Sequence, residues 1–286
     1  ETFEKAIKMA VVGQERAIHL ITIAIFSRGH VLLEGDVGVG KTTLLRAVAR
    51  AIGGSYERVE GSVDMMPTDL IYYTYIGEGG KPKVDPGPLL RHGNSLSTFF
   101  FNEINRARPQ VHALLLRSMA ERSVTAFNKE YNFPHLQVFA DRNRIEKEET
   151  FEISSAAKDR FLMEISIETP LSTDVRKDLI FETKFHNVDK LIKSVPENVL
   201  PYEDLNNFSD IIQNTIQASD SMKDYSLRIW AALRDPSSLG IKDFDGISFN
   251  RLIESGASPR GMAMLLRAAK VNAWLAGRLN LIPEDL

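Results

Sequence analysis

The chain opens with a long region in which short apolar runs alternate with amphipathic stretches. Runs rich in β-branched and aromatic residues predict buried strands at 30–34, 97–101, 136–140 and 162–167. Apolar residues spaced three and four apart predict helices at 41–52 and 109–121, and a short helix is expected at 155–160. Because strands and helices alternate, we expect an α/β fold with a mostly parallel sheet flanked by helices.

The pattern changes after Pro170, where the strand signal fades and helical spacing continues. We expect one helix at 205–217 and a final helix whose N-cap is Ser258. The change predicts two domains, an α/β domain over 1–175 and a smaller all-helical domain over 176–286.

The composition excludes several classes of protein. Among 286 residues, 35 Lys and Arg against 38 Asp and Glu give a net charge of -3, which argues against a broad basic surface for nucleic acid. A hydrophobic fraction of 43% excludes a wholly disordered chain, and no apolar run is long enough to span a membrane. The absence of cysteine excludes disulfides and thiolate metal sites, and it suits a reducing compartment, so we expect a cytoplasmic protein. The six histidines are scattered, and we expect no metal site apart from a nucleotide.

Residues 35–42 read GDVGVGKT and match the phosphate-binding pattern G-x-x-x-x-G-K-[ST] between a predicted strand and a predicted helix. Glycines let backbone N–H groups curl around phosphate oxygens, and the start of a helix favours negative charge. Lys41 can reach the β- and γ-phosphates, and the Thr42 hydroxyl can bind Mg²⁺. The expected nucleotide-binding residues here are Gly35, Asp36, Gly38, Val39, Gly40, Lys41, Thr42 and Thr43.

A second element of such a site follows about sixty residues later, where the apolar run 99–101 ends in Asn102 and Glu103. In nucleotide hydrolases of this type an aspartate at the first position holds the Mg²⁺ shell, and a glutamate can polarise the attacking water. Asn102 is therefore a candidate metal residue without charge, so weaker metal affinity is expected. Glu103 is the candidate general base.

Further motifs occur in a fixed order along the chain, and together with the phosphate loop they resemble the MoxR family of AAA+ ATPases over nearly the whole length. They are VGQE at 12–15, DPGPL at 85–89, NEINRA at 102–107, MAERSVT at 119–125, NRIE at 143–146 with Glu149 and Thr150, DRF at 159–161 and GASPR at 256–260. The resemblance implies an AAA+ core over 1–175 and a helical lid over 176–286 that lacks its last helix. It also implies ATP and Mg²⁺ as ligands and self-association into a ring, usually a hexamer.

The resemblance also implies roles for individual residues. Val12 and Gly13 resemble the segment that packs on adenine, and Asn143 resembles the sensor that contacts the γ-phosphate or the attacking water. Arg160 resembles the arginine finger that reaches a neighbouring subunit's nucleotide. Arg260 resembles the second sensor, which closes the lid on the nucleotide of its own subunit.

Two segments resemble the hairpins of the family. The first, 62–85, has an aromatic run and a glycine turn and would project near the ring pore; its Met65, Met66, Tyr72, Tyr73 and Tyr75 would contact a partner or cover the core. The second is 127–134. The chain departs from the family pattern at Asn102, where Asp is usual, and at 141–144, which read DRNR where Thr-Gln-Asn-Pro is usual. The sensor asparagine stays in place, with charge added beside it.

Three functions are weighed from the sequence. The resemblance implies an ATP-driven ring that remodels or activates a partner protein, as a chaperone for maturation or for insertion of a metal or cofactor. Methanol dehydrogenase activation is one candidate task, often with a von Willebrand factor A protein. The alternative is an ATP-binding scaffold whose hydrolysis is disabled by Asn102. A DNA-acting ATPase is disfavoured by the charge, and the client protein is not identified by the sequence.

Overall fold

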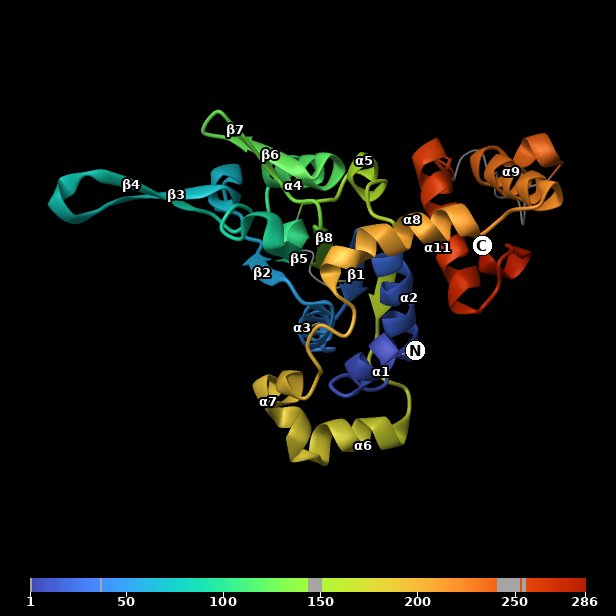
Figure 1. Ribbon diagram of the computed structural model, residues 1–286, viewed down its shortest axis with the longest axis horizontal. Helices are drawn as coiled ribbons and strands as arrows, with labels where there is room; N and C mark the ends of the chain where they lie inside the picture. Colours follow the sequence, from blue (N-terminus) through green and yellow to red (C-terminus); the bar gives the residue numbers. More distant parts are fainter. Residues whose placement is uncertain (1, 37, 144–150, 241–252, 254–255) are drawn as a thin grey trace. The chain divides into compact units, whose positions relative to one another are not determined.

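The computed structural model describes residues 2–36, 38–143, 151–240, 253 and 256–286. The chain forms two compact units, unit 1 (Glu1–Asn206) and unit 2 (Asn207–Leu286) (Figure 1). Two parts of the sequence motifs lie outside the described residues: Val37 of the phosphate loop, and 144–150, which hold Arg144, Ile145, Glu146, Glu149 and Thr150.

Unit 1 is built on a five-stranded parallel sheet with the strand order β2-β5-β8-β1-β9. The strands are β1 (Val31–Gly35), β2 (Ser55–Glu60), β5 (Leu96–Asn102), β8 (Gln137–Arg142) and β9 (Met163–Ile167). Four of them confirm strands predicted from apolar runs. β2 was not predicted, because it is an edge strand of mostly charged and polar residues in which only Val59 is buried.

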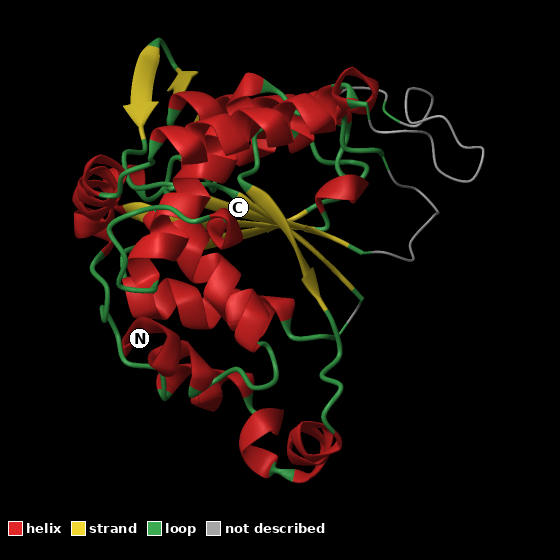
Figure 2. Cartoon of the chain, turned by 90° about the vertical axis from the view of Figure 1, so that its right-hand side faces the viewer, coloured by secondary structure: helices red, strands yellow, loops and turns green. Residues whose placement is uncertain are grey.

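Helices flank both faces of this sheet (Figure 2). The described helices that lie wholly in unit 1 are α1 (Thr2–Lys8), α2 (Glu15–Phe26), α3 (Lys41–Ile52), α4 (Pro109–Glu121), α5 (Ser155–Lys158), α6 (Thr173–Phe181) and α7 (Val188–Lys193). On one face, Phe99, Phe101 and Val138 form a buried cluster with Val111 and Leu115 of α4. Alternate strand residues point to the opposite face, against which α2 and α3 pack. Burial on both faces explains the consecutive apolar residues 31–33, 99–101 and 138–140 in the central strands.

Two hairpins extend from unit 1. β3 (Tyr72–Ile76) pairs with β4 (Pro82–Pro86), and β6 (Ser123–Ala126) pairs with β7 (Lys129–Asn132), both antiparallel. The β3–β4 hairpin projects away from the sheet of its own unit (Figure 1). These elements fall within or beside the two segments for which the sequence predicts hairpins.

The two units divide between residues 206 and 207, later than the sequence-based boundary after residue 175. The segment after α6 belongs to unit 1 because it bonds to α3. Arg50 of α3 donates from Nε to the carbonyl of Val195 at 2.6 Å and pairs with Glu197 at 2.5 Å. Arg46 also pairs with Asp189 of α7 at 2.7 Å. Such pairings are set by tertiary structure, and helical periodicity does not reveal them.

Unit 2 is helical in its described residues. α8 (Leu205–Thr215) spans the division, and α9 (Asp220–Arg234) and α11 (Pro259–Leu275) follow. Ser258 caps α11 as expected, because its side-chain oxygen accepts a hydrogen bond from the Gly261 amide at 2.9 Å. Among the described residues, no helix is long and apolar enough to cross a membrane.

His30 connects the sheet to α4 just before β1. Its Nδ1 accepts from the backbone N–H of Val138 at 2.9 Å, so its Nε2 carries the proton and donates to the Met119 carbonyl at 3.2 Å. Burial, with the positive charges of Arg122 and Arg28, lowers the pKa of His30 to about 3. The folded protein therefore requires the neutral imidazole.

This requirement predicts acid sensitivity. In the unfolded chain His30 binds a proton below pH about 6.5, whereas the folded chain excludes it down to about 3. The free energy of unfolding should therefore fall as pH drops through this window, by about 1.4 kcal/mol per pH unit from His30. His30→Gln, whose amide can also donate and accept, should flatten the slope measured by urea unfolding at several pH values. His186→Gln, at an exposed histidine, is the control, and equal slopes for His30→Gln and the native chain would contradict the assignment.

Candidate active site

The phosphate loop connects β1 to α3, as the sequence predicts. Gly40 precedes α3 with a φ of 89°, and Gly38 has a φ of 82°, backbone conformations that side chains with a Cβ rarely adopt. A Cβ placed on either glycine would meet no atom of the described residues within 4 Å, apart from its chain neighbours. Asp36 lies exposed in the loop, and Thr42 and Thr43 are partly buried in the first turn of α3.

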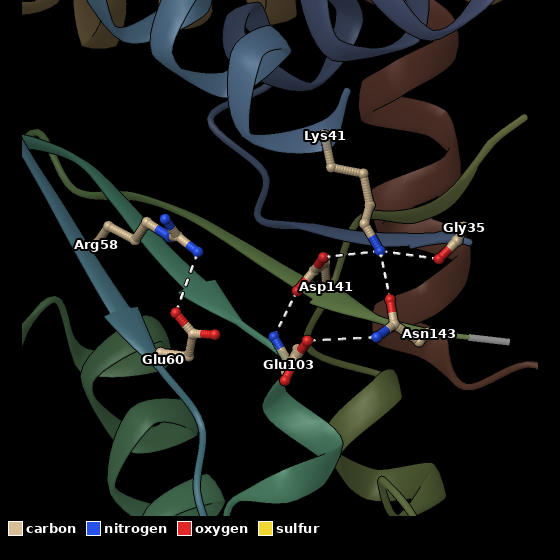
Figure 3. A network of polar contacts seen from close by, with 7 residues as sticks. All are labelled: Gly35, Lys41, Arg58, Glu60, Glu103, Asp141 and Asn143. Carbon is tan, nitrogen blue, oxygen red and sulfur yellow. Dashed lines mark hydrogen bonds and ion pairs between the residues drawn. The ribbon is translucent and has the colours of Figure 1, made fainter. Parts of the chain in front are cut away.

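Lys41 is the centre of a buried polar network at the carboxyl ends of three strands (Figure 3). Its Nζ donates to the Gly35 carbonyl and to Asn143 Oδ1, both at 2.8 Å, and pairs with Asp141 Oδ2 at 2.9 Å. The Lys41 side chain is 8% exposed and that of Asp141 is 1% exposed. An ammonium group has three donors, so all three have partners here.

Glu103 joins this network from the end of β5. Its φ of 54° is uncommon for a residue other than glycine, and such conformations cluster at functional sites. The Glu103 N–H donates to Asp141 Oδ1 at 2.5 Å, and Asn143 Nδ2 donates to Glu103 Oε1 at 3.4 Å. Arg106 Nη1 lies 3.2 Å from Glu103 Oε2. Asn143 therefore contacts both Lys41 and Glu103.

A buried histidine supports the segment that follows Glu103. His112 of α4 donates from Nε2 to the Ile104 carbonyl at 2.6 Å, and burial lowers the pKa of His112. The neutral imidazole thus ties the short 3₁₀ turn Ile104–Arg106 to α4.

Asp141 is the functional candidate that the sequence reasoning missed as a site residue. The register pairs Phe101 of β5 with Ala140 of β8, so Asn102 and Asp141 are the next residues on adjacent strands. The signal in the sequence was a carboxylate at the end of the apolar run 136–140. Its contacts could not be predicted, because they depend on the pairing of strands distant in the chain.

The residues at this edge of the sheet fit Mg²⁺ bound together with a nucleotide. Thr42, Asn102, Glu103 and Asp141 offer hydroxyl, amide and carboxylate oxygens, which are the ligands that Mg²⁺ prefers. Among the described residues no group of three or more His, Cys, Asp or Glu side chains could hold a metal ion.

A cavity of about 310 Å³ adjoins the phosphate loop within unit 1. Besides loop residues it is lined by Val12, Gln14, Thr43, Pro170, Leu179, Phe185 and Leu191. Gln14 Nε2 donates to the Glu168 carbonyl at 2.7 Å and so fixes one wall. A Cβ on Gly13 would lie 2.7 Å from a Pro170 carbon, so Gly13 allows close packing there. A largely apolar cavity beside a phosphate loop suits a planar base.

The two arginines expected in the site lie elsewhere in the chain. Arg160 follows α5 and lines a surface hollow of about 560 Å³ with residues of α4 and α5. Its Nε is buried and has no hydrogen-bond partner among the described residues. Arg260 is the second residue of α11 in unit 2.

Comparison with family models agrees with this architecture. Residues 30–163 match a model described as "ATPase family associated with various cellular activities (AAA)", and residues 249–286 match the AAA lid domain. A crystal structure of a candidate ATPase from Cytophaga hutchinsonii is similar, with a TM-score of 0.83 and 28% sequence identity. The match covers 99% of this chain and 82% of that one.

Curated relatives match along nearly the whole chain. Protein MoxR of Methylorubrum extorquens is 62% identical over 284 residues, which cover 99% of this chain and 82% of the relative. Protein MoxR of Paracoccus denitrificans is 55% identical, over 99% of this chain and 83% of the relative. Chaperone MoxR1 of Mycobacterium tuberculosis is 31% identical, over 100% of this chain and 72% of the relative. With this similarity and the site geometry in agreement, the chain belongs to the MoxR family of AAA+ ATPases.

Proposed function

We propose that this chain binds ATP with Mg²⁺ and hydrolyses it in a ring of subunits, a hexamer as is usual for the family, in order to remodel or activate a partner protein. The observation that carries the proposal is the buried Lys41 network beside a phosphate loop and an apolar cavity. A lysine on the solvated surface would donate its hydrogen bonds to water, whereas Lys41 donates to three protein acceptors in a buried site.

Each part of the site has a role in binding. The cavity near Val12 and Gly13 takes the adenine, and the amides of the loop contact the phosphates. Lys41 is held at the start of α3, from which it can transfer its hydrogen bonds to phosphate oxygens. Thr42 and Asn102 would hold Mg²⁺, which when bound neutralises phosphate charge.

Hydrolysis requires a base for the attacking water. Glu103 lies at the end of β5 with its carboxylate beside Asn143, and it would accept the water proton at a carboxylate oxygen. Asn143 contacts both Lys41 and Glu103, so it would orient the water relative to the γ-phosphate. This arrangement favours hydrolysis over the alternative of an ATP-binding scaffold disabled by Asn102.

Completion of the site depends on assembly. Arg160 lines a surface hollow, and its buried Nε has no hydrogen-bond partner in the described part of the chain. Its guanidinium would reach the nucleotide of a neighbouring subunit. Arg260 at the start of α11 would contact the nucleotide of its own subunit. An arginine supplied by a neighbour contributes about 10³ to 10⁵ to the rate in phosphoryl-transfer enzymes. We therefore infer that a dilute subunit binds ATP and hydrolyses it slowly.

The partner surface includes the β3–β4 hairpin. Ile76 is 79% exposed, and Tyr73, Tyr75 and Met66 are also exposed, so these side chains do not cover the core. The Tyr72 ring instead lies against the Phe127 ring, with centroids 5.0 Å apart and planes tilted by 51°, and Met65 packs against the core cluster. Exposed aromatic and aliphatic side chains on a projecting hairpin are typical of protein contact sites.

The name of one relative, Chaperone MoxR1, supports a chaperone role. We propose maturation of a metal- or cofactor-containing enzyme in the cytoplasm, with methanol dehydrogenase as the candidate client and a von Willebrand factor A protein as a candidate partner. The net charge of -3 disfavours nucleic acid as the target.

Replacing the base should separate binding from hydrolysis. Glu103→Gln should keep its affinity for ATP and lose hydrolysis by about 10² to 10⁴, the usual contribution of a general base. The measurement is phosphate release at concentrations where rings form, beside binding of a fluorescent ATP analogue. Glu60→Gln on β2 is the matched control, because Glu60 pairs only with Arg58 among the contacts drawn in Figure 3. Unchanged turnover in Glu103→Gln would contradict the role of Glu103.

Mixing two inactive variants tests the arginine finger. Arg160→Ala and Glu103→Gln should each hydrolyse ATP poorly, whereas mixed rings should regain activity, because an intact Glu103 then meets an intact Arg160 from the neighbour. Phosphate release is measured after subunit exchange, with mixing verified by fluorescence energy transfer. The control mixes Glu103→Gln with the double variant Glu103→Gln/Arg160→Ala, which should stay inactive. Verified mixed rings without recovery would exclude Arg160 as the residue supplied by a neighbour.

A further inference from the structure

We infer that Asp141 on β8 supplies the carboxylate that the end of β5 lacks at Asn102, so that Mg²⁺-dependent nucleotide binding in this chain depends on Asp141. The inference rests on the proposed function, because it assumes that ATP and Mg²⁺ bind at this edge of the sheet. In this proposal the carboxylate comes from the end of β8, whereas the resembled pattern has it at the end of the adjacent strand β5.

The register of the sheet places residues 102 and 141 side by side on adjacent strands. Phe101 pairs with Ala140, so Asn102 and Asp141 follow at equivalent positions on adjacent parallel strands. Neighbouring strands lie about 4.8 Å apart, and residues in register point to the same face. That face is also the one from which Lys41 reaches Asp141. A carboxylate at 141 therefore serves the same small region as a carboxylate at 102.

Asp141 contacts both the lysine expected to bind phosphate and the backbone of the candidate base. Oδ2 pairs with Lys41 of the phosphate loop at 2.9 Å, and Oδ1 accepts the Glu103 N–H at 2.5 Å. The side chain is 1% exposed, so its charge has almost no contact with water. One buried carboxylate thus touches the residue expected to bind phosphate and the backbone of the candidate base.

Binding of nucleotide creates a need for a cation beside Asp141. If Lys41 turns to the phosphates, the carboxylate loses the partner that compensates its burial, and a buried unpaired charge is strongly unfavourable. A divalent cation that arrives with the phosphates removes that penalty. The neutral amide of Asn102 creates no such requirement, because it has no charge to compensate.

The two departures from the resembled pattern coincide at this point. The chain has Asn where Asp is usual at 102, and it has Asp where Thr is usual at 141. One negative charge is lost from β5 and one is gained on β8, and Arg142 beside it pairs with Glu34 and Glu164. The rival explanation is that Asp141 serves only as the counter-ion of Lys41 and competes with phosphate.

The test measures the affinity for a fluorescent ATP analogue in Mg²⁺ and in EDTA. Four proteins are compared: the native chain, Asp141→Asn, Asn102→Asp and the exchange variant Asn102→Asp/Asp141→Asn. Mg²⁺ should strengthen binding to the native chain, and Asp141→Asn should reduce this enhancement by about 10- to 100-fold. The exchange variant should recover it. Asp85→Asn, at an exposed strand position, is the control and should leave both affinities unchanged.

Two results with Asp141→Asn would overturn the inference. One is an undiminished Mg²⁺ enhancement, and the other is tighter binding in both Mg²⁺ and EDTA, which the counter-ion explanation predicts. If the native chain binds ATP in neither condition, the proposed function itself fails. If it binds ATP and Asp141→Asn behaves like the native chain, only the present inference fails.

Asn102→Asp gives an answer even if Asp141→Asn does not fold. Because Asp141 already supplies a carboxylate, a second one at 102 should change the Mg²⁺ enhancement by less than about tenfold. A larger gain would show that the native site lacked an effective carboxylate, and it would overturn the inference. Thermal melting of each variant without nucleotide confirms that the compared proteins are folded.

Discussion

The buried ion pair between Lys41 and Asp141 is the interaction on which the rest of the site depends. Charges removed from water are tolerated only when their remaining donors and acceptors are satisfied. Here the Gly35 carbonyl and Asn143 Oδ1 accept the other two hydrogen bonds of the Lys41 ammonium. The Glu103 N–H donates to the second oxygen of the Asp141 carboxylate. The pair therefore fixes the relative positions of the phosphate loop, the end of β5 and the end of β8.

The sheet makes this convergence possible. Its strand order places β8 between β5 and β1, and parallel strands bring their carboxyl ends to one edge. Phe99 and Phe101 of β5 are buried on the face covered by α4. This packing fixes the end of β5, which Glu103 follows. The polar edge thus rests on a tightly packed apolar core, which keeps the functional groups in place before a nucleotide binds.

Local sequence patterns predicted much of this architecture. The strands β1, β5, β8 and β9 and the helices α3, α4 and α11 follow from apolar runs, helical spacing and capping residues. The phosphate loop was evident because its glycines and Lys41 form a contiguous motif. The edge strand β2, the division at residue 206 and the contacts of Asp141 were not predictable, because they depend on pairing between distant segments. The roles of Arg160 and Arg260 stay predictions, since both depend on contacts beyond a single compact unit.

The most direct test of this account is a crystal structure of the assembled protein with Mg²⁺ and a non-hydrolysable ATP analogue. The account predicts phosphates over residues 35–42, the Lys41 ammonium moved onto a phosphate oxygen, and the Asp141 carboxylate facing the Mg²⁺ ion or its water. A nucleotide bound elsewhere, or Asp141 still paired only with Lys41 and remote from the metal, would contradict it.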